Sequence, residues 1–256
     1  MAGCGGGGRQ PAGLAPGEHD VTAWAPPAAR PISDAKAAAL VTRTPESQPE
    51  NEAANRYVPS DRQLAAFHAA QRTAAAAGLD NPLPAYVTGR PGIKDPSTDD
   101  LIQWVSHKWG IPTAWIRAQL FVESRWQERE HGDLSTVSGA QYAATPVSLR
   151  GPRLDQIYAS VGIAQVKSLP FATTGTGTEP LRRRSTAFNL DYYAATVRYY
   201  FDGYCHWCSA GYRSGEAWPS VGAWDSPQPW GNAVARAYVS AVRSALAAAP
   251  WTNRGL

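Results

Sequence analysis

The sequence predicts a mainly α-helical domain that follows a disordered N-terminal tether. Apolar residues recur at intervals of three and four along several segments, which is the spacing of one face of an α-helix. No alternating apolar run is long enough to predict a strand, and we find no internal repeat. A length of 256 residues suits one sizeable domain with additional segments. We therefore expect a tether over residues 1–55 and one domain over residues 56–256.

Residues 1–55 are rich in Gly, Pro, Ala, Gln and Glu and contain few large aliphatic side chains. Such a segment buries too little apolar surface to offset the entropy lost on ordering, which predicts disorder. The opening Met1–Cys4 ends in Ala-Gly-Cys and is followed by four glycines, as at the cleaved end of a bacterial lipoprotein signal. We expect an exported, cell-envelope protein whose only membrane contact is a lipid on Cys4. Chance occurrence of this short motif is the alternative.

The first half of the domain contains three predicted helices. Ser60 caps a helix that runs to residue 77, where Gly78 stops it. After a proline-rich loop over residues 81–96, Thr98 begins a second helix that ends at Gly110. Pro112 opens a third helix, through about residue 126, because proline is tolerated in a first helical turn.

The second half begins with polar residues 127–160, which predict surface loops. Ser185 or Thr186 begins a helix to residue 202, and Gly203 ends it. The last predicted helix spans residues 232–248. Its apolar stripe repeats every four residues and consists of Val234, Tyr238, Val242 and Leu246.

Glu123 lies within the apolar arc of the third predicted helix. At 100° per residue, Glu123 falls on the same side as Ile116 and Leu120. Burial disfavours an ionised carboxylate and raises its pKa, so that the acid stays protonated near neutral pH and can donate a proton. The alternative is a glutamate whose stem packs while its carboxylate reaches water.

Three segments resemble motifs of one enzyme family. Residues 118–126, Ala-Gln-Leu-Phe-Val-Glu-Ser-Arg-Trp, resemble the Glu-Ser helix of the lytic transglycosylases related to goose-type lysozyme (glycoside hydrolase family 23, SLT domain). Residues 160–167 resemble the family's Gly-x-x-Gln motif, and residues 185–193 resemble its Asn-bearing helix. The motifs occur in the family's order, within a region of about residues 98–248. The resemblance implies a lysozyme-like helical domain with loops that form a substrate cleft.

The resemblance also implies a reaction on peptidoglycan glycan strands. In that family one glutamate, here Glu123, protonates the glycosidic oxygen between N-acetylmuramic acid and N-acetylglucosamine and then acts as the base. The acetamido group and the 6-hydroxyl of the substrate complete the reaction to a 1,6-anhydro end, so that no second catalytic carboxylate, metal or organic cofactor is required. The residues expected to bind the sugars or line the cleft are Ser124, Gln165, Asn189, Tyr193 and Trp224.

Two departures from the family pattern keep other functions open. The segment after the Glu-Ser helix is long, and an acid within it could direct a water and make the protein a hydrolytic muramidase. These acids are Glu128, Glu130 and Asp133. The family's Tyr-Asn-x-Gly has no clean match, and Trp224 stands in the place of its tyrosine. If that tyrosine steadies the glutamate, another group must do so here. A non-catalytic wall-binding lipoprotein is the alternative outside enzymes.

Cys205 and Cys208 have the spacing of half a zinc site, of a redox pair or of a local disulfide. No second Cys-x-x-Cys is present in the sequence to complete a zinc site, so we expect no bound metal. A disulfide is the favoured state in an oxidising envelope, and two free thiols are the alternative.

Composition limits the possible partners. Ten Trp and eleven Tyr supply many rings with a polar edge, which suit sugar-binding surfaces, although a ring-rich core is the alternative. A net charge of +3 is too small to predict nucleic-acid binding, and the basic run 182–184 is typical of a solvated face. No stretch approaches the roughly 20 apolar residues of a membrane-spanning helix. We expect a monomer that acts on glycan strands.

Overall fold

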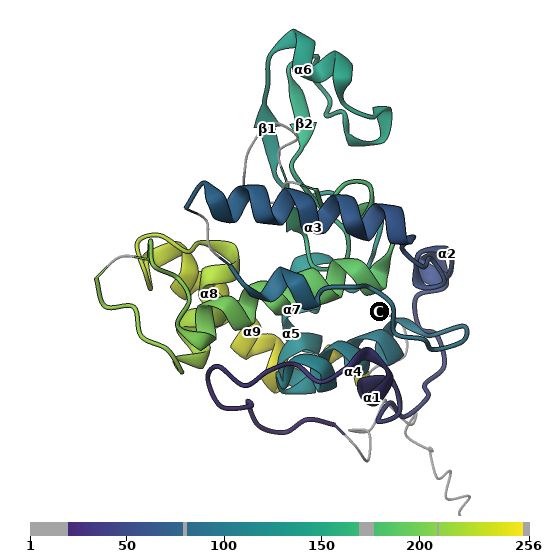
Figure 1. Ribbon diagram of the computed structural model, residues 1–256, viewed down its shortest axis with the longest axis vertical. Coiled ribbons are helices and arrows are strands. Elements are labelled where there is room, and N and C mark those ends of the chain that lie inside the picture. The colour runs from purple at the N-terminus through teal and green to yellow at the C-terminus, as the bar shows by residue number, and fades with distance from the viewer. Residues whose placement is uncertain (1–19, 79–80, 169–176, 209, 253–256) are drawn as a thin grey trace, which may run out of the picture.

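Helices surround a central helix, α7 (Thr186–Asp202), in the computed structural model, which describes residues 20–78, 81–168, 177–208 and 210–252 (Figure 1). α7 packs against both α4 and α8, and most of its residues are buried. The other long helices are α3 (Asp61–Ala76), α4 (Thr98–Trp109), α5 (Thr113–Ser124), α8 (Ala217–Asp225) and α9 (Ala233–Ala248). The prediction of a mainly α-helical fold is confirmed. None of the described helices is long and apolar enough to cross a membrane.

Shorter elements connect and flank these helices. The short α-helices are α1 (Asp34–Ala38), α2 (Glu52–Asn55) and α6 (Gly139–Ala144). The 3-10 helices are η1 (Pro49–Asn51), η2 (Leu83–Tyr86), η3 (Val147–Leu149), η4 (Leu181–Arg183) and η5 (Pro250–Thr252). The strands are β1 (Leu134–Thr136), β2 (Gln156–Tyr158), β3 (Ser160–Val161) and β4 (Val166–Lys167).

Capping groups fix the ends of the correctly predicted helices. Ser97 and Asp100 form a capping box at the start of α4, and Gly110 ends that helix in the left-handed conformation with φ 61°. The hydroxyl of Ser185 accepts from the backbone N–H of Phe188 at the start of α7. These bonds satisfy backbone groups that a helix end leaves unpaired, which is why the sequence located these ends within a residue or two.

The third predicted helix ends two residues earlier than expected. Arg125 and Trp126 both have left-handed backbone conformations, with φ 53° and 68°, so α5 stops at Ser124. The chain then turns back, and the buried indole of Trp126 donates to the backbone oxygen of Arg117 at 3.0 Å. Burial of this ring under its own helix opposes a further helical turn.

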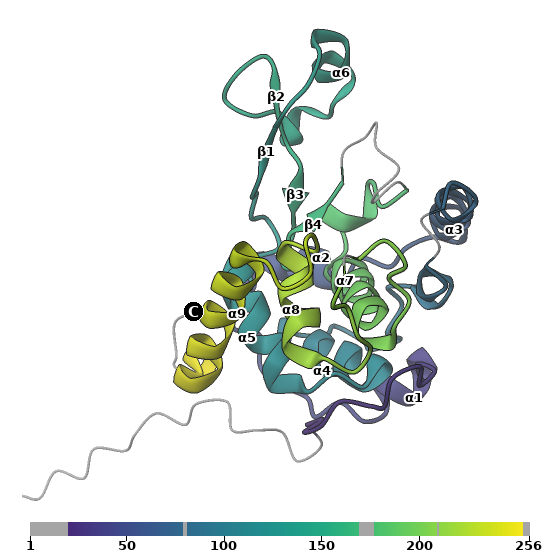
Figure 2. The same cartoon turned by 90° about the vertical axis from the view of Figure 1, so that its left-hand side faces the viewer.

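Residues 127–160 contain more regular structure than the predicted surface loops. β1 and β2 pair antiparallel, with Ser135 opposite Ile157, and α6 lies between them in the chain. Both views show this hairpin projecting away from the helical body (Figures 1 and 2). β3 and β4 form a second antiparallel pair near its base. The strands are two or three residues long, which is too short to leave an alternating pattern in the sequence.

Residues 20–45, here called the N-terminal belt, are ordered on the helical body, so the predicted tether over 1–55 is wrong for residues 20–55. The ring of Trp24 stacks on Phe201 with centroids 4.5 Å apart and meets Trp115 edge-on. The backbone N–H of Ala25 donates to the oxygen of Gly110 at 2.8 Å. Residues 46–55 include the buried Asn51 and Asn55. The composition of the segment did not reveal this order because its partners lie elsewhere in the chain. Residues 1–19, including Cys4, lie outside the described residues.

Candidate active site

Glu123 lies in the last turn of α5, where α5 packs against α9 (Figure 2). The hydroxyl of Tyr238, from α9, donates to Oε1 of Glu123 at 2.5 Å. The ring of Tyr238 is buried, whereas Glu123 keeps partial exposure to solvent. The carboxyl group is therefore held by a strong donor, in a residue that is still open to solvent on part of its surface.

Burial raises the pKa of Glu123 to about 8. The hydrogen bond from Tyr238 opposes this rise, and the negative charge of Asp225 adds to it. A second opposing hydrogen bond comes from the Trp224 side chain, and Asp133 contributes a further, smaller rise. The acid is mostly protonated at neutral pH, yet it titrates close enough to neutrality to return a proton.

Ser124 and Asn189 support the site without facing it. Asn189 is fully buried, and its Nδ2 donates to the backbone oxygens of Val161 at 3.0 Å and Arg182 at 2.6 Å, while its Oδ1 accepts from Ala164 N–H at 2.9 Å. The Ser124 hydroxyl donates to the backbone oxygen of Ile163 at 2.7 Å. Asn189, which was expected to support the cleft, has its amide buried and bonded to the loop over residues 161–166, here called the support loop. Ser124 was expected to bind the sugars, but its hydroxyl is buried and bonded to the same loop.

Gly162 allows this close approach between the support loop and Asn189. Its φ is +85°, and a Cβ at this position would lie 2.1 Å from Asn189 Nδ2 and 2.7 Å from the backbone oxygen of Arg182. Only glycine fits both the backbone conformation and the space. The close packing of the support loop on Asn189 therefore requires the glycine of the Gly-x-x-Gln motif.

Glu128 supports the same loop from the interior. Its Oε2 accepts from the backbone N–H of Ile163 at 3.0 Å, and its own N–H donates to Oδ1 of Asn51 at 2.9 Å. Burial raises the pKa of Glu128 to about 8. Because its side chain is almost fully enclosed, the prediction that Glu128 could direct a water is wrong. Glu130, in contrast, is exposed.

Gln165 lies in the support loop, and Tyr193 lies near Glu123. Gln165 adopts a left-handed backbone conformation, with φ 54°, and its Nε2 donates to the oxygen of Gly162 at 2.8 Å. Tyr193 is fully buried, and its pKa is raised by burial and by the nearby charge of Glu123. Its ring meets that of Trp224 edge-on at 5.0 Å. Trp224, which is only partly buried, is the predicted ring best placed to contact a ligand.

Two further carboxyl groups face the region of Glu123. Asp133 forms an ion pair with Lys167 at 3.0 Å, and both side chains are exposed. Asp225, at the end of α8, has a pKa raised by partial burial and by the charge of Asp133, which Lys167 opposes. Asp133 is thus the one member of the three predicted acids that adds to the field at Glu123, and the sequence did not single out Asp225.

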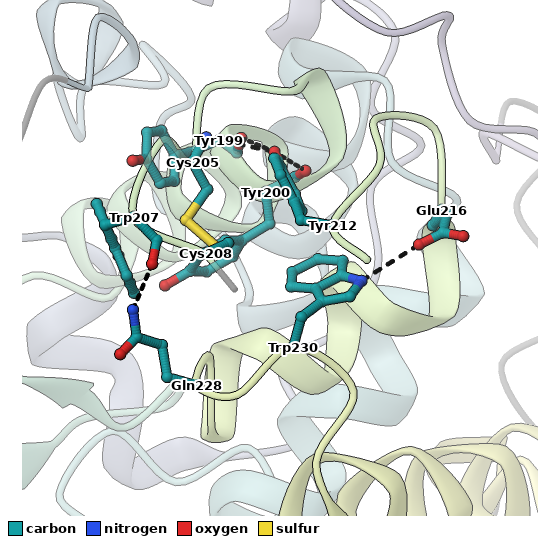
Figure 3. Close-up of a disulfide and its surroundings, with 9 residues drawn as sticks. All are labelled: Tyr199, Tyr200, Cys205, Trp207, Cys208, Tyr212, Glu216, Gln228 and Trp230. Atoms are coloured by element: carbon teal, nitrogen blue, oxygen red, sulfur yellow. Dashed lines mark hydrogen bonds between the residues drawn. A yellow bond between two sulfur atoms is a disulfide. The ribbon is translucent and has the colours of Figure 1, made fainter. Parts of the chain in front are cut away.

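Cys205 and Cys208 form the predicted disulfide, which is confirmed (Figure 3). The backbone N–H of Cys205 donates to the Tyr212 hydroxyl at 3.3 Å, and the Gln228 amide donates to the oxygen of Trp207 at 2.5 Å. The second bond links the disulfide turn to the segment that follows α8. Among the described residues, no cluster of three or more His, Cys, Asp or Glu side chains is arranged to hold a metal.

The chain matches no family model, no curated protein and no solved structure.

Replacing Tyr238 with Phe is expected to raise the pKa of Glu123 above its value of about 8, because the hydroxyl stabilises the ionised carboxylate. NMR titration of protein with ¹³C-labelled glutamate carboxyl groups measures this value directly. Tyr142→Phe, on the projecting hairpin, is the control and should leave the titration unchanged. An unchanged or lowered pKa in Tyr238→Phe would contradict the role given to this hydroxyl.

Proposed function

We propose that the protein is a peptidoglycan lytic transglycosylase with a lysozyme-like domain whose loops form the substrate cleft. The observation that carries the proposal is the partly exposed Glu123, with a pKa raised to about 8 and a hydrogen bond from Tyr238. The three motifs that resemble this family add support, since Glu123, Ser124 and Asn189 come from two of them and the support loop is the third.

The proposed reaction uses Glu123 twice. The protonated acid donates its proton to the oxygen between N-acetylmuramic acid and N-acetylglucosamine as the bond from C1 to that oxygen breaks. The acetamido group of the substrate stabilises C1, and the 6-hydroxyl then bonds to C1 while its proton passes to the Glu123 carboxylate. The acid is regenerated, no water is consumed, and the product ends in a 1,6-anhydro ring. This chemistry needs no metal or cofactor.

A hydrolytic muramidase is the second candidate, and one observation favours it. The carboxyl groups of Asp133 and Asp225 both lie near enough to Glu123 to influence its pKa. A carboxylate in this position could orient a water toward C1, which would give a reducing end in place of the anhydro ring.

Mass spectrometry of the products from isolated sacculi tests both candidates. We expect muropeptides with 1,6-anhydro ends. Reducing ends would replace the transglycosylase by a muramidase, and the absence of released products would favour a non-catalytic wall-binding protein. We also propose export to the cell envelope, where this polymer lies, with Cys4 as the lipid attachment site.

A further inference from the structure

An open groove lies between α8 and α9, outside the region of Glu123. The two helices are neighbours along their lengths (Figure 2), and the groove has a volume of about 430 Å³. Gly222 permits this packing, because a Cβ there would lie 3.0 Å from the backbone oxygen of Ala235. Residues that line the groove include Trp218, Pro219, Gly222, Arg236, Val239 and Arg243.

Trp218 is held in a fixed position in this groove. Its ring stacks on Trp115 with centroids 3.9 Å apart, and the guanidinium of Arg243 lies 4.4 Å from its centroid. The ring is therefore held by a neighbour from α5 and a cation from α9. Little side-chain entropy is lost when a ligand contacts a ring that is already fixed.

The charge of the groove is positive. Arg236 and Arg243 are both exposed, and no acidic residue is among those that line the groove. Neither arginine forms an ion pair within the part of the chain that the structure describes. Seven helical residues separate them, which corresponds to roughly 10.5 Å along the axis of α9. A complementary ligand carries two anionic groups at about this spacing and an apolar portion between them.

We propose that this groove binds the peptide that hangs from the glycan strand, through two of its carboxylates. The proposal rests on the proposed function. An extended peptide advances about 3.3–3.6 Å per residue, so carboxylates about three residues apart match the two arginines. A peptide with one side-chain and one terminal carboxylate at that separation would match both arginines. Trp218 and Trp224 are six residues apart on α8, or roughly 9 Å along its axis, so a peptide attached near Glu123 can reach the groove.

Binding of a synthetic wall tetrapeptide with free carboxylates to the full chain tests this proposal without any turnover. Calorimetry should give a Kd that rises roughly tenfold in the double variant Arg236→Gln and Arg243→Gln, since each exposed ion pair contributes at most about fivefold to the affinity. When its carboxylates are amidated, the same peptide should bind the wild type with a Kd that is also roughly tenfold higher. Arg62→Gln, an exposed arginine on α3, is the matched control and should bind as the wild type does.

Equal peptide affinity of the wild type and the double variant would overturn the proposed peptide site. Equal affinity for the free and the amidated peptide, or no binding at millimolar peptide concentration, would overturn it as well. Products from sacculi report separately on the proposed function. Arginine-dependent binding without any glycan product would overturn the catalytic proposal and leave the peptide site in place. Unchanged thermal unfolding of the double variant checks that the fold is retained.

Discussion

Replacing Glu123 with Gln is expected to reduce glycan cleavage by about 10²- to 10⁴-fold or more, which is the range that general acid catalysis contributes. Gln has nearly the shape of Glu and can still accept the hydrogen bond from Tyr238, but it cannot release a proton. Because one carboxyl group would serve as both acid and base, both steps of the reaction are lost. The rate of soluble product release from sacculi measures the effect.

Three other carboxyl groups provide the controls for Glu123→Gln. Glu130→Gln should retain cleavage, because Glu130 is exposed. Asp133→Asn and Asp225→Asn should reduce the rate of glycan cleavage far less than Glu123→Gln if the substrate's acetamido group assists the reaction. If either carboxylate directs a water, its substitution should reduce the rate about as much as Glu123→Gln does. Wild-type cleavage by Glu123→Gln would show that another residue is the acid.

Removing residues 1–45 is expected to unfold the domain at 25 °C. The N-terminal belt supplies partners to three buried cations: Asp34 to Lys108, Asp20 to Arg117, and the backbone oxygens of Ala25 and Pro26 to Arg198. Each cation keeps one buried carboxylate partner, Asp191, Asp99 or Asp202, but loses its hydrogen bonds to the belt. A hydrogen bond to a charged group contributes about 1.5–3 kcal/mol, so three such losses approach the total stability of a typical domain, about 5–15 kcal/mol. Circular dichroism during urea unfolding measures the change.

A variant that lacks only residues 1–19 separates the effect of the belt from that of shortening the chain. Asp20→Asn and Asp34→Asn should each lower the free energy of unfolding, whereas Asp155→Asn should change it by less than about 1 kcal/mol. Asp155 pairs with Arg153 in an exposed ion pair. A cooperative transition at the wild-type midpoint after removal of residues 1–45 would contradict this account of the belt.

Several of the helices that the sequence predicted have ends set by local bonds. Ser97 caps α4 and Asn232 caps α9 within three residues of the groups they bind, so the signal lies in a short window. α8 was not predicted, because Pro219 and Gly222 lie within it and its apolar residues show no clear period. Its stability comes from packing against α7 and α9, which a local pattern does not contain.

In the candidate site, too, the sequence located a residue whose signal is local and missed a contact between distant parts of the chain. Glu123 was found because its position in an apolar arc is a property of one helix. Tyr238 was assigned to the apolar stripe of the last helix, and its hydroxyl meets a carboxyl group 115 residues earlier in the chain. Nothing in a stripe of apolar residues distinguishes a core tyrosine from one that donates to a distant acid.

The contacts of the N-terminal belt also have a consequence for the order of folding. The guanidinium of Arg198 bonds to the carbonyl of Ala25 across 173 positions of the chain, and Arg117 reaches Asp20 across 97. Helical proteins with mainly local contacts fold fast, and each long-range closure slows the search for the native state. During synthesis from the N-terminus, the contacts of the belt with Arg198 and Phe201 must wait until α7 has been made. Trp24 therefore stays exposed to water, and to other chains, until most of the polypeptide has been made.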